Sequence, residues 1–341
     1  MQPDSSVKYE TFPEDNMWSE LKQALDSRNT FVLTTHVSPD GDGVGAQLAL
    51  QEYLQTLGKT VHIVNADPVS HRYAFLERDG SFLADSPEAR KLVESADATI
   101  FVDTASWSQL GSLENFIRNT HSFRIAIDHH PAGDLEADLM VRNIEASATC
   151  ELLYDFLQAV DFRITRSMAS ALFVGIATDT GWFRYANATP RVFEIAATLC
   201  DGGAPCSKFY HLIYEQDPVE RLRLLGKALA TTSADADGQI IYFCVSHAMF
   251  QEVGVGESYT ESFISYARLI RGGKIIILFK ETEPGVIHVS FRSRGDVDVR
   301  AIARELGGGG HYNASGATAH GELQTVIRDV LSRARRALTV S

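Results

Sequence analysis

Short apolar runs alternate with amphipathic segments along the first 200 residues. Four runs are apolar throughout, a pattern typical of strands that are buried on both faces of a parallel sheet. These runs are residues 31–36, 61–67, 98–104 and 123–130. Residues 44–58 have helical spacing and end at Gly58, and glycine is a common helix stop. The order predicts an α/β fold built on a mostly parallel sheet with flanking helices.

The remaining pattern predicts a second, smaller domain of mixed α/β character. Helices are predicted at 146–160, 167–178, 190–200, 261–270, 299–306 and 325–338, and strands at 239–246, 274–282 and 286–293. A break rich in Gly and Pro at 201–207 ends the first domain. We therefore expect a catalytic domain over 1–207, a linker helix over 208–230 that Pro218 interrupts or begins, and a substrate-binding domain over 231–341.

Composition limits the classes of partner. With 341 residues, 45% hydrophobic and 22% charged, the chain suits two folded domains, and no apolar run is long enough to span a membrane. A net charge of −13 disfavours long nucleic acid, because that affinity depends largely on neutralising phosphates. Residues 261–341 nevertheless carry a net charge of +4, which leaves −17 for the rest. This asymmetry suits metal ions and a small phosphorylated substrate, although random drift of surface charge explains it equally well.

The cysteines and the N-terminal residues indicate the cellular compartment in which the protein is expected. Cys150, Cys200, Cys206 and Cys244 show no C-x-x-C spacing, so neither a zinc ribbon nor a redox pair is indicated. The polar, acidic N-terminus lacks the order of a secretion signal. We expect four reduced thiols in a cytoplasmic protein.

Histidines and aspartates follow the apolar runs. They are His36, Asp40, Asp42, Asp103, Asp128, His129, His130 and Asp179. The carboxyl ends of parallel strands meet at one edge of a sheet, where ligands usually bind. Imidazole with carboxylate suits Mn²⁺, Mg²⁺, Co²⁺ or Fe²⁺, and the number of such groups is enough for two ions. A single aspartate could instead cap a helix, but capping does not explain the whole set.

The first of these motifs is expected to form a tight loop. Pro39, Gly41 and Gly43 make regular structure improbable over residues 36–43, so the helix that follows is predicted to start near Val44. Such a loop can point several ligands inward.

These motifs resemble a known family. HVSPDGDGVGA, FVDTAS, IDHH and ATDTGWF are similar to the four metal motifs of the DHH phosphoesterases. RAIARELGGGGHYNASG is similar to the signature of the domain that accompanies them. The resemblance runs from about residue 31 to 318. It implies the short two-domain branch, whose members act as nano-RNases and 3′-phosphoadenosine 5′-phosphate (pAp) phosphatases, and it implies a homodimer.

The resemblance also implies residue roles. His36, Asp40 and Asp103 would hold one ion, and Asp42, Asp103, His129 and Asp179 the other, with Asp103 bridging them. The ions would be Mn²⁺, with Mg²⁺ and Co²⁺ as alternatives. His130 would lie beside the substrate phosphate, so His130 and Asp103 are the expected catalytic residues. Asp128 would orient a histidine.

The second domain offers candidate substrate contacts. Gly308, Gly309, Gly310 and His311 belong to a glycine-rich loop, 307–316, that could bind an anion through its amides or could be a flexible turn. Arg292 and Arg294 lie two apart on a predicted strand, so both should face one side, toward phosphate or simply toward solvent. The resemblance favours binding of a short nucleotide.

The expected function is metal-dependent hydrolysis of very short oligoribonucleotides, such as pApA, and of pAp. A cyclic di-AMP phosphodiesterase, a pyrophosphatase or exopolyphosphatase, and a nucleotide sensor without catalysis are the alternatives. The glycine run favours nucleotides over bare polyphosphate, and the intact set of ligands argues against the sensor.

Overall fold

The structure is a computed structural model that describes residues 14–77, 80–131 and 133–340. Its contacts divide the chain into two compact units, Met1–Gln216 and Asp217–Ser341, and each unit is described by itself. Within the described residues, no helix is both long enough and apolar enough to cross a membrane.

The first unit is built on a parallel sheet. Its strand order is β3-β2-β1-β4-β5-β6, and every neighbouring pair is parallel. The strands are β1 (Thr30–Thr34), β2 (Thr60–Asn65), β3 (Phe82–Ala84), β4 (Ala98–Val102), β5 (Phe123–Asp128) and β6 (Leu139–Arg142). The α/β class and the four predicted strands are confirmed, whereas the short strands β3 and β6 were not predicted.

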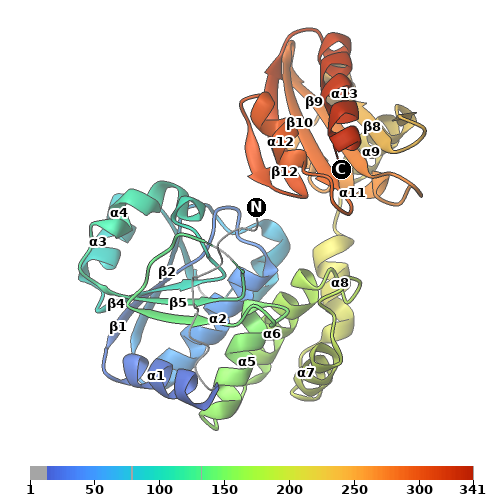
Figure 1. Cartoon of the computed structure of the whole chain (residues 1–341). Helices are drawn as coiled ribbons and strands as arrows, with labels where there is room; N and C mark the ends of the chain where they lie inside the picture. The colour runs from blue at the N-terminus through green and yellow to red at the C-terminus, as the bar shows by residue number, and fades with distance from the viewer. Residues whose placement is uncertain (1–13, 78–79, 132, 341) are drawn as a thin grey trace. The chain divides into compact units, whose positions relative to one another are not determined.

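Helices cover both faces of this sheet (Figure 1). The helices are α1 (Glu14–Asp26), α2 (Gly41–Thr56), α3 (Pro87–Ser95), α4 (Glu114–Arg118), α5 (Thr149–Ala159), α6 (Arg166–Asp179), α7 (Pro190–Asp201) and α8 (Cys206–Tyr214), with 3₁₀ turns η1 (His71–Leu76) and η2 (Trp107–Leu113). Helices α1, α2, α5 and α6 share one apolar core with the sheet, and α3, η2 and α4 share another on the opposite face.

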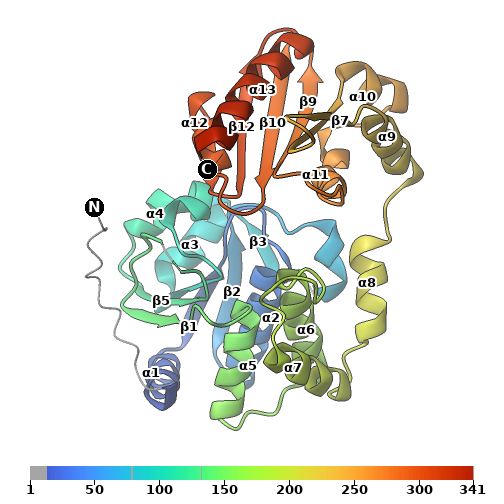
Figure 2. The same ribbon diagram turned by 45° about the vertical axis from the view of Figure 1, so that its right-hand side comes forward.

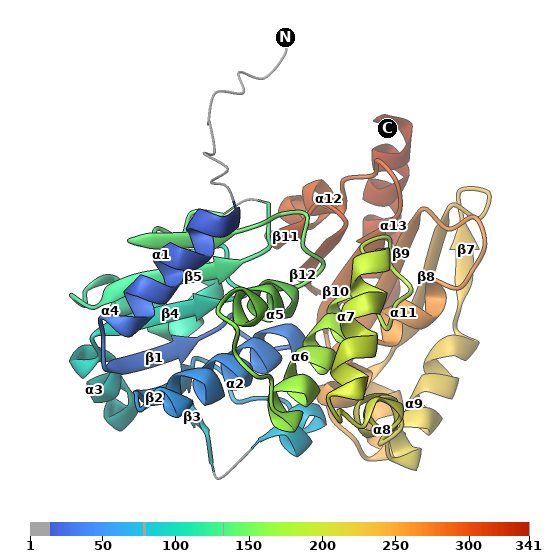
Figure 3. The same cartoon turned by 90° about the horizontal axis from the view of Figure 1, so that it is seen from below.

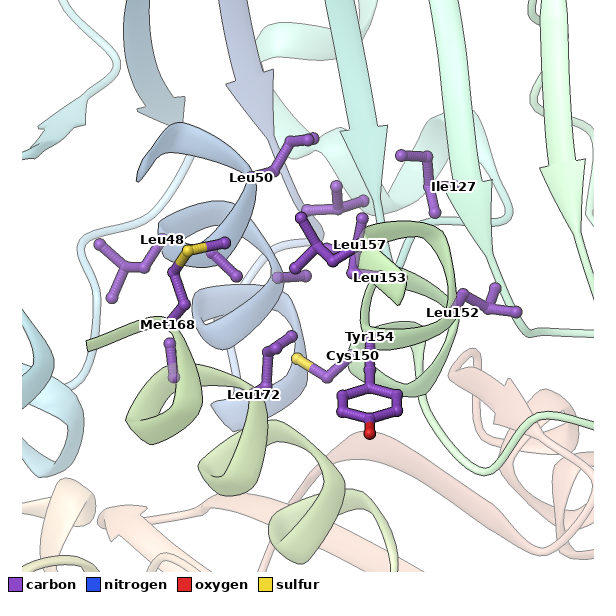
Figure 4. Packing of buried hydrophobic residues seen from close by; sticks show 14 of the residues in the cluster. Leu48, Leu50, Ile127, Cys150, Leu152, Leu153, Tyr154, Leu157, Met168 and Leu172 are labelled. Carbon is purple, nitrogen blue, oxygen red and sulfur yellow. The ribbon is translucent and has the colours of Figure 1, made fainter. Parts of the chain in front are cut away.

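Helix α2 is the centre of the larger core. It lies beside α5 and α6 (Figure 3), and Leu50, Leu153 and Leu172 are among the side chains that fill the space between these helices (Figure 4). Small residues allow the close approach, because a β-carbon at Gly45 would lie 2.4 Å from the carbonyl oxygen of Ala171. The tight packing fixes both ends of α2 relative to the sheet.

The second unit contains a mixed sheet with strand order β11-β12-β10-β9-β8-β7 (Figure 2). Within the described strands of this sheet, β8 and β9 form the only parallel pair. The strands are β7 (Ser233–Asp235), β8 (Ile240–Val245), β9 (Ile275–Glu283), β10 (Val286–Ser293), β11 (Gly309–His311) and β12 (Ala314–His320). The three predicted strands and the mixed character are confirmed.

Helices pack on both faces of the mixed sheet. They are α9 (Val219–Ala230), α10 (His247–Val253), α11 (Phe263–Ala267), α12 (Val299–Glu305) and α13 (Leu323–Val340), with the 3₁₀ turn η3 (Glu257–Thr260). Helices α12 and α13 share a core with one face, and α9, α10 and α11 share a core with the other. Pro218 precedes α9, as predicted, and α8 and α9 are separate helices.

Two sequence predictions about loops are wrong. Helix α2 begins at Gly41 and not near Val44, because Asp40 caps it and Gly43 packs tightly where a β-carbon would lie 2.4 Å from the Thr35 hydroxyl oxygen. The segment 307–316 is not a loop either. It follows helix α12 and forms strand β11 and the start of strand β12, which pair with each other.

The cysteine prediction is also wrong in part. Cys200 and Cys206 form a disulfide that joins the end of α7 to the start of α8. Cys150 and Cys244 are free thiols. The sequence separation of six residues does not follow a redox or zinc spacing, so only proximity in the fold identifies the pair.

A candidate metal centre at the carboxyl edge of the parallel sheet

The predicted ligands converge at one edge of the first unit. Strands β1, β4 and β5 end there, helix α2 begins there, and α6 ends there. These elements carry His36, Asp40 and Asp42, then Asp103, then Asp128, His129 and His130, and finally Asp179. The carboxyl ends of three parallel strands and the end of α6 therefore bring together residues from four distant segments.

Asp103 lies at the centre of the cluster. Its Oδ2 is 3.4 Å from Nε2 of His36, and its Oδ1 is 3.5 Å from Nε2 of His129. One carboxylate thus faces two separate imidazoles, one through each oxygen. Its backbone has a φ of 54°, which is unusual for a residue other than glycine, and its amide donates to the Ile127 carbonyl oxygen at 3.0 Å. The left-handed turn directly after β4 places the carboxylate in this position.

The first group of possible ligands contains His36, Asp40 and Asp103, each of which has a donor atom within 4.8 Å of the others. Nε2 of His36 is 3.6 Å from Oδ1 of Asp40, and Nδ1 of His36 lies 2.8 Å from the Val37 carbonyl oxygen. Asp40 also caps α2, because its Oδ1 accepts the amides of Asp42 and Gly43 at 2.9 and 3.1 Å. Asp40 can therefore cap α2 and also face His36 as a metal ligand would.

The second group surrounds His129. Its Nε2 lies 3.5 to 3.9 Å from oxygens of Asp42, Asp103 and Asp179. Its other nitrogen, Nδ1, lies 3.2 Å from the Ala146 carbonyl oxygen, which orients the ring. His130 is also close to this group, with Nδ1 3.7 Å from Oδ1 of Asp103.

A buried carboxylate holds the ring of His130. Nδ1 of His130 donates to Oδ1 of Asp128 at 2.8 Å, and Asp128 is fully buried. The other oxygen of Asp128 lies 3.4 Å from Nη2 of Arg142. The side chain of His130 is 39% exposed, so its ring is anchored at one nitrogen and open to solvent elsewhere.

Crowding of acidic and imidazole groups shifts their proton affinities. Burial lowers the pKa of His36, but Asp103 and Asp40 raise it to about 11. Burial likewise opposes the charge on His129, whereas Asp103, Asp42 and Asp179 raise its pKa to about 10. Burial raises the pKa of Asp179 to about 6. Without metal, protons on the imidazoles therefore balance the carboxylates.

The pKa values of Asp42 and Asp103 shift in opposite directions. Burial raises the pKa of Asp42, and repulsion from Asp103 and Asp179 adds to this effect. Burial also opposes the charge on Asp103, but contacts with His129 and His36 bring its pKa below the usual range. Asp103 is thus the carboxylate that the surrounding cations stabilise most directly.

The donor set fits divalent cations. Two ligands of one ion, each about 2.1 Å from it, lie about 3.0–3.4 Å apart. The contacts of Asp103 with His36 and His129, at 3.4 and 3.5 Å, are close to this spacing. Five aspartates around three histidines also form an excess of negative charge in a largely buried place, and such charges need metal or another cation.

Several groups at this site were not found from sequence. Asp42 accepts the backbone amides of Thr149 and Cys150, the first residues of α5, at 2.6 and 2.9 Å. The Thr149 hydroxyl donates to Asp103 at 3.2 Å. Arg142 lies beside Asp128. The sequence signal for Thr149 is the run SATCE at the start of a helix, but nothing local links it to Asp42.

In the second unit, Arg292 lies on β10 and lines a cavity of about 490 Å³ with Lys280 and Ser290. Its Nη1 donates to the Phe291 carbonyl oxygen at 2.9 Å. The prediction that Arg294 shares this strand is wrong, because β10 ends at Ser293. The Arg294 guanidinium instead donates to the Arg268 carbonyl oxygen.

The predicted glycines have individual packing roles. A β-carbon at Gly308 would lie 2.1 Å from the Gly316 carbonyl oxygen, and Gly310 has a φ of +133°. At Gly309 no atom lies within 4 Å of that position. The side chain of His311 lies outside the described part of the structure. The glycine run is thus explained largely by close strand pairing, and its role in binding stays a prediction.

Comparison with known proteins gives related sequences over nearly the whole chain. The model of the "DHH family, N-terminal domain" matches residues 30–176, and that of the "DHHA1 domain" matches residues 239–339. A Thermus thermophilus protein named "Bifunctional oligoribonuclease and PAP phosphatase NrnA" is 31% identical over 332 residues, which are 96% of this chain and 97% of that one.

Solved structures show the same fold. An exopolyphosphatase-related protein from Bacteroides fragilis has a TM-score of 0.88 at 22% identity, with 97% of each chain covered. RecJ from Thermus thermophilus, crystallised with Mn²⁺, has a TM-score of 0.55 at 15% identity and covers 96% of this chain and 55% of that chain. The aspartates and histidines converge in one site, and a relative matches along nearly the full length of the chain. The chain therefore belongs to the DHH family of phosphoesterases.

Proposed function

We propose that this chain hydrolyses phosphate esters in very short oligoribonucleotides, such as pApA, and in pAp, with two divalent ions held at the candidate metal centre. The observation that carries the proposal is the position of Asp103 between His36 and His129, which suits a carboxylate shared by two ions. The substrates follow from the name of the Thermus thermophilus relative, an oligoribonuclease and PAP phosphatase.

The proposed ligands divide as the family resemblance implies. His36, Asp40 and Asp103 would hold one ion, and Asp103, with Asp42, His129 and Asp179, would hold the other. Two bound ions would polarise phosphoryl oxygens and lower the pKa of a water molecule. The donor set suits Mn²⁺, the ion present in the RecJ crystal structure, with Mg²⁺ and Co²⁺ as alternatives.

The protein residues would orient the substrate. Asp128 holds Nδ1 of His130, so Nε2 is the nitrogen available to contact the phosphate. We propose the catalytic role for residues 1–207 and nucleotide binding for residues 231–341. In the second unit, Arg292 lines the 490 Å³ cavity with a guanidinium that suits a phosphate, whereas Lys280 in the same cavity is paired with Glu257.

The test is turnover of linear pApA by the purified full chain with Mn²⁺. Metal-dependent release of AMP is expected, and it should be lost with EDTA and in Asp103→Ala. Arg292→Ala should weaken the hydrolysis of pApA more than that of a generic phosphodiester. If Mn²⁺ binds but pApA, pAp and short RNA all stay intact, the proposal is wrong.

Two further properties belong to the same proposal. We propose a cytoplasmic homodimer, as the family resemblance implies. Two of the four cysteines, Cys150 and Cys244, are free thiols, as expected for a cytoplasmic protein, whereas Cys200 and Cys206 form a disulfide. Light scattering of the purified chain would give its mass in solution.

A further inference from the structure

An exposed aromatic cluster is formed by residues of the turn that follows Asp179 and by residues of helix α8. Tyr185, Tyr210 and Tyr214 are 50%, 44% and 39% exposed. The ring of Trp182 contacts those of Tyr210 and Tyr214 edge-on, with centroids 5.3 and 5.5 Å apart. Large aromatic rings gathered at a surface generally mark a binding site.

The backbone beneath the cluster is unusual. Gly181, Trp182 and Phe183 have φ values of 59°, 60° and 62°, so two bulky residues adopt the left-handed conformation in succession. Hydrogen bonds hold them there, from the Trp182 amide to the Ala177 carbonyl oxygen at 2.6 Å and from the Phe183 amide to Thr180 Oγ1 at 3.2 Å. Strained backbone of this kind concentrates at ligand-binding and catalytic sites.

The strained turn is tied to the metal centre. Asn187 donates from Nδ2 to the carbonyl oxygen of Asp179 at 3.3 Å and to that of Ser147 at 3.1 Å. Tyr185 lies against Gly181, because a β-carbon there would be 2.4 Å from the phenol ring. The turn thus anchors the Tyr185 ring near a predicted ligand while half of the residue stays exposed.

Two arginines give the cluster positive charge. Arg184 is exposed, and its Nε donates to the Gly181 carbonyl oxygen at 2.7 Å. Arg72 donates from Nη1 to the Ile213 carbonyl oxygen at 2.8 Å, on the helix that carries Tyr214. Burial raises the pKa of Tyr214, whereas the charges of Arg184 and Arg72 oppose this rise. Aromatic rings combined with arginine suit nucleotides, through base stacking and attraction to phosphate.

We infer that the aromatic patch formed by Trp182, Arg184, Tyr185, Tyr210 and Tyr214 receives a nucleobase of the substrate, with Tyr185 as the stacking ring. The inference rests on the function proposed above and adds a positioning residue on the catalytic unit. The occupant is a nucleobase and not a second protein copy, because the strained turn anchors the ring to a metal-site segment and the flanking charges suit an anionic nucleotide. Stacking on a tyrosine tolerates any base, so the patch would favour nucleotides over bare polyphosphate without selecting a sequence.

The test compares Tyr185→Ala and Tyr185→Phe on pApA and on two analogues that each lack one adenine. In Tyr185→Ala, KM for pApA should rise roughly five- to fifty-fold with kcat changed by less than about two-fold, whereas Tyr185→Phe should resemble the parent. The analogue that lacks the adenine stacked on Tyr185 should already have a higher KM than pApA with the parent enzyme. Tyr185→Ala should not raise the KM of that analogue further. Phe193→Ala is the matched control, since Phe193 is 53% exposed and stacks on Phe183 outside the patch.

Equal losses by Tyr185→Ala on pApA and on both analogues would overturn the inference. The same rise in KM with Phe193→Ala, or dissociation of an oligomer by Tyr185→Ala, would also overturn it. A binding measurement separates this outcome from failure of the proposed function. With EDTA present, a dinucleotide containing 2-aminopurine should lose fluorescence on binding the parent and Tyr185→Phe, but not Tyr185→Ala. This quenching reports stacking even if no substrate is hydrolysed.

Discussion

Gly41 and Thr178 are in direct contact, and a β-carbon at Gly41 would lie 2.3 Å from the Thr178 hydroxyl oxygen. This contact brings the first turn of α2 against the last turn of α6. The two turns carry Asp40 and Asp42 on one side and Asp179 on the other. The glycine is therefore required for the close approach of two groups of predicted ligands, and not for a flexible loop.

Gly41→Ala should impair both stability and activity. The new methyl group has no space, so α2 and α6 must separate, which should lower the free energy of unfolding by about 1–3 kcal/mol. Displacing ligands by even about 1 Å should lower kcat/KM on the order of 100-fold. Urea unfolding and pApA turnover measure the two effects.

The chain offers a matched control for this substitution. Gly226 lies inside α9 with no atom within 4 Å of its β-carbon position, so Gly226→Ala should stabilise the protein by about 0.5–1 kcal/mol. Thr178→Ala removes the two closest atoms and should partly rescue Gly41→Ala. An unrescued or fully active Gly41→Ala variant would argue against the packing explanation.

The sequence predicts the first unit well because its signals are local. Uniformly apolar runs identify β1, β4 and β5, and the residues that follow them are the converging histidines and aspartates. Parallel topology alone then implies that Asp103 and His129 meet at one edge. By contrast, β3 contains three residues and β6 four, too few for any periodicity to emerge.

Other features depend on contacts between distant residues. The bond from the Thr149 amide to Asp42 joins positions 107 residues apart, and no local pattern encodes it. Gly41, Gly43 and Gly308 look like loop residues in sequence, yet each is a glycine because another element occupies the space of its side chain. A glycine required by tertiary packing cannot be distinguished from a flexible one without the neighbouring element.

Asp128→Asn should lower activity without unfolding the protein. The carboxylate accepts the Nδ1 proton of His130, which fixes the tautomer and raises the pKa of the imidazole. Asparagine is uncharged and offers a single carbonyl oxygen to two donors, Nδ1 of His130 and Nη2 of Arg142, so the ring would be held less firmly. We expect a loss of about 10–100-fold in kcat/KM, with circular dichroism unchanged.

The pH profile provides the internal check on the Asp128 prediction. Since loss of the carboxylate should lower the pKa of His130, a profile that depends on protonated His130 should shift to lower pH in Asp128→Asn. An unchanged profile with unchanged kcat/KM would show that Asp128 does not act through His130.

Removing the charge of Asp103 should affect both proposed ions together. Among the described residues, Asp103 belongs to both groups whose donor atoms lie within 4.8 Å of one another, one with His36 and Asp40 and the other with His129 and His130. Asp103→Asn should therefore lower Mn²⁺ affinity by at least about tenfold at each ion position, as measured by isothermal titration calorimetry. Asp201→Asn, at an exposed position at the end of α7, should bind Mn²⁺ as the parent does. Loss of a single ion with the other unaffected would exclude the bridging role.

The stability of the metal-free protein should fall as pH rises from 7 to 9. His36 and His129 have folded-state pKa values of about 11 and 10, raised above the value of 6.5 for an ordinary histidine. Above pH 6.5 the unfolded chain loses the imidazole protons while the folded chain keeps them. The contribution of the two histidines to the free energy of unfolding is therefore complete below pH 6.5 and decreases through pH 10–11. In the window from pH 7 to 9, Asp179, with a pKa of about 6, is already ionised and contributes little slope.

Urea unfolding in EDTA at several pH values measures this slope. We expect a loss on the order of 1–2 kcal/mol per pH unit, because each histidine contributes up to about 1.4 kcal/mol per unit. His36→Gln should reduce the slope, since glutamine does not titrate. Saturating Mn²⁺ should flatten it, because the proposed ligands must give up those protons to bind metal. If the metal-free protein is equally stable at pH 7 and 9, the two imidazoles are not held protonated by Asp103 and its neighbours.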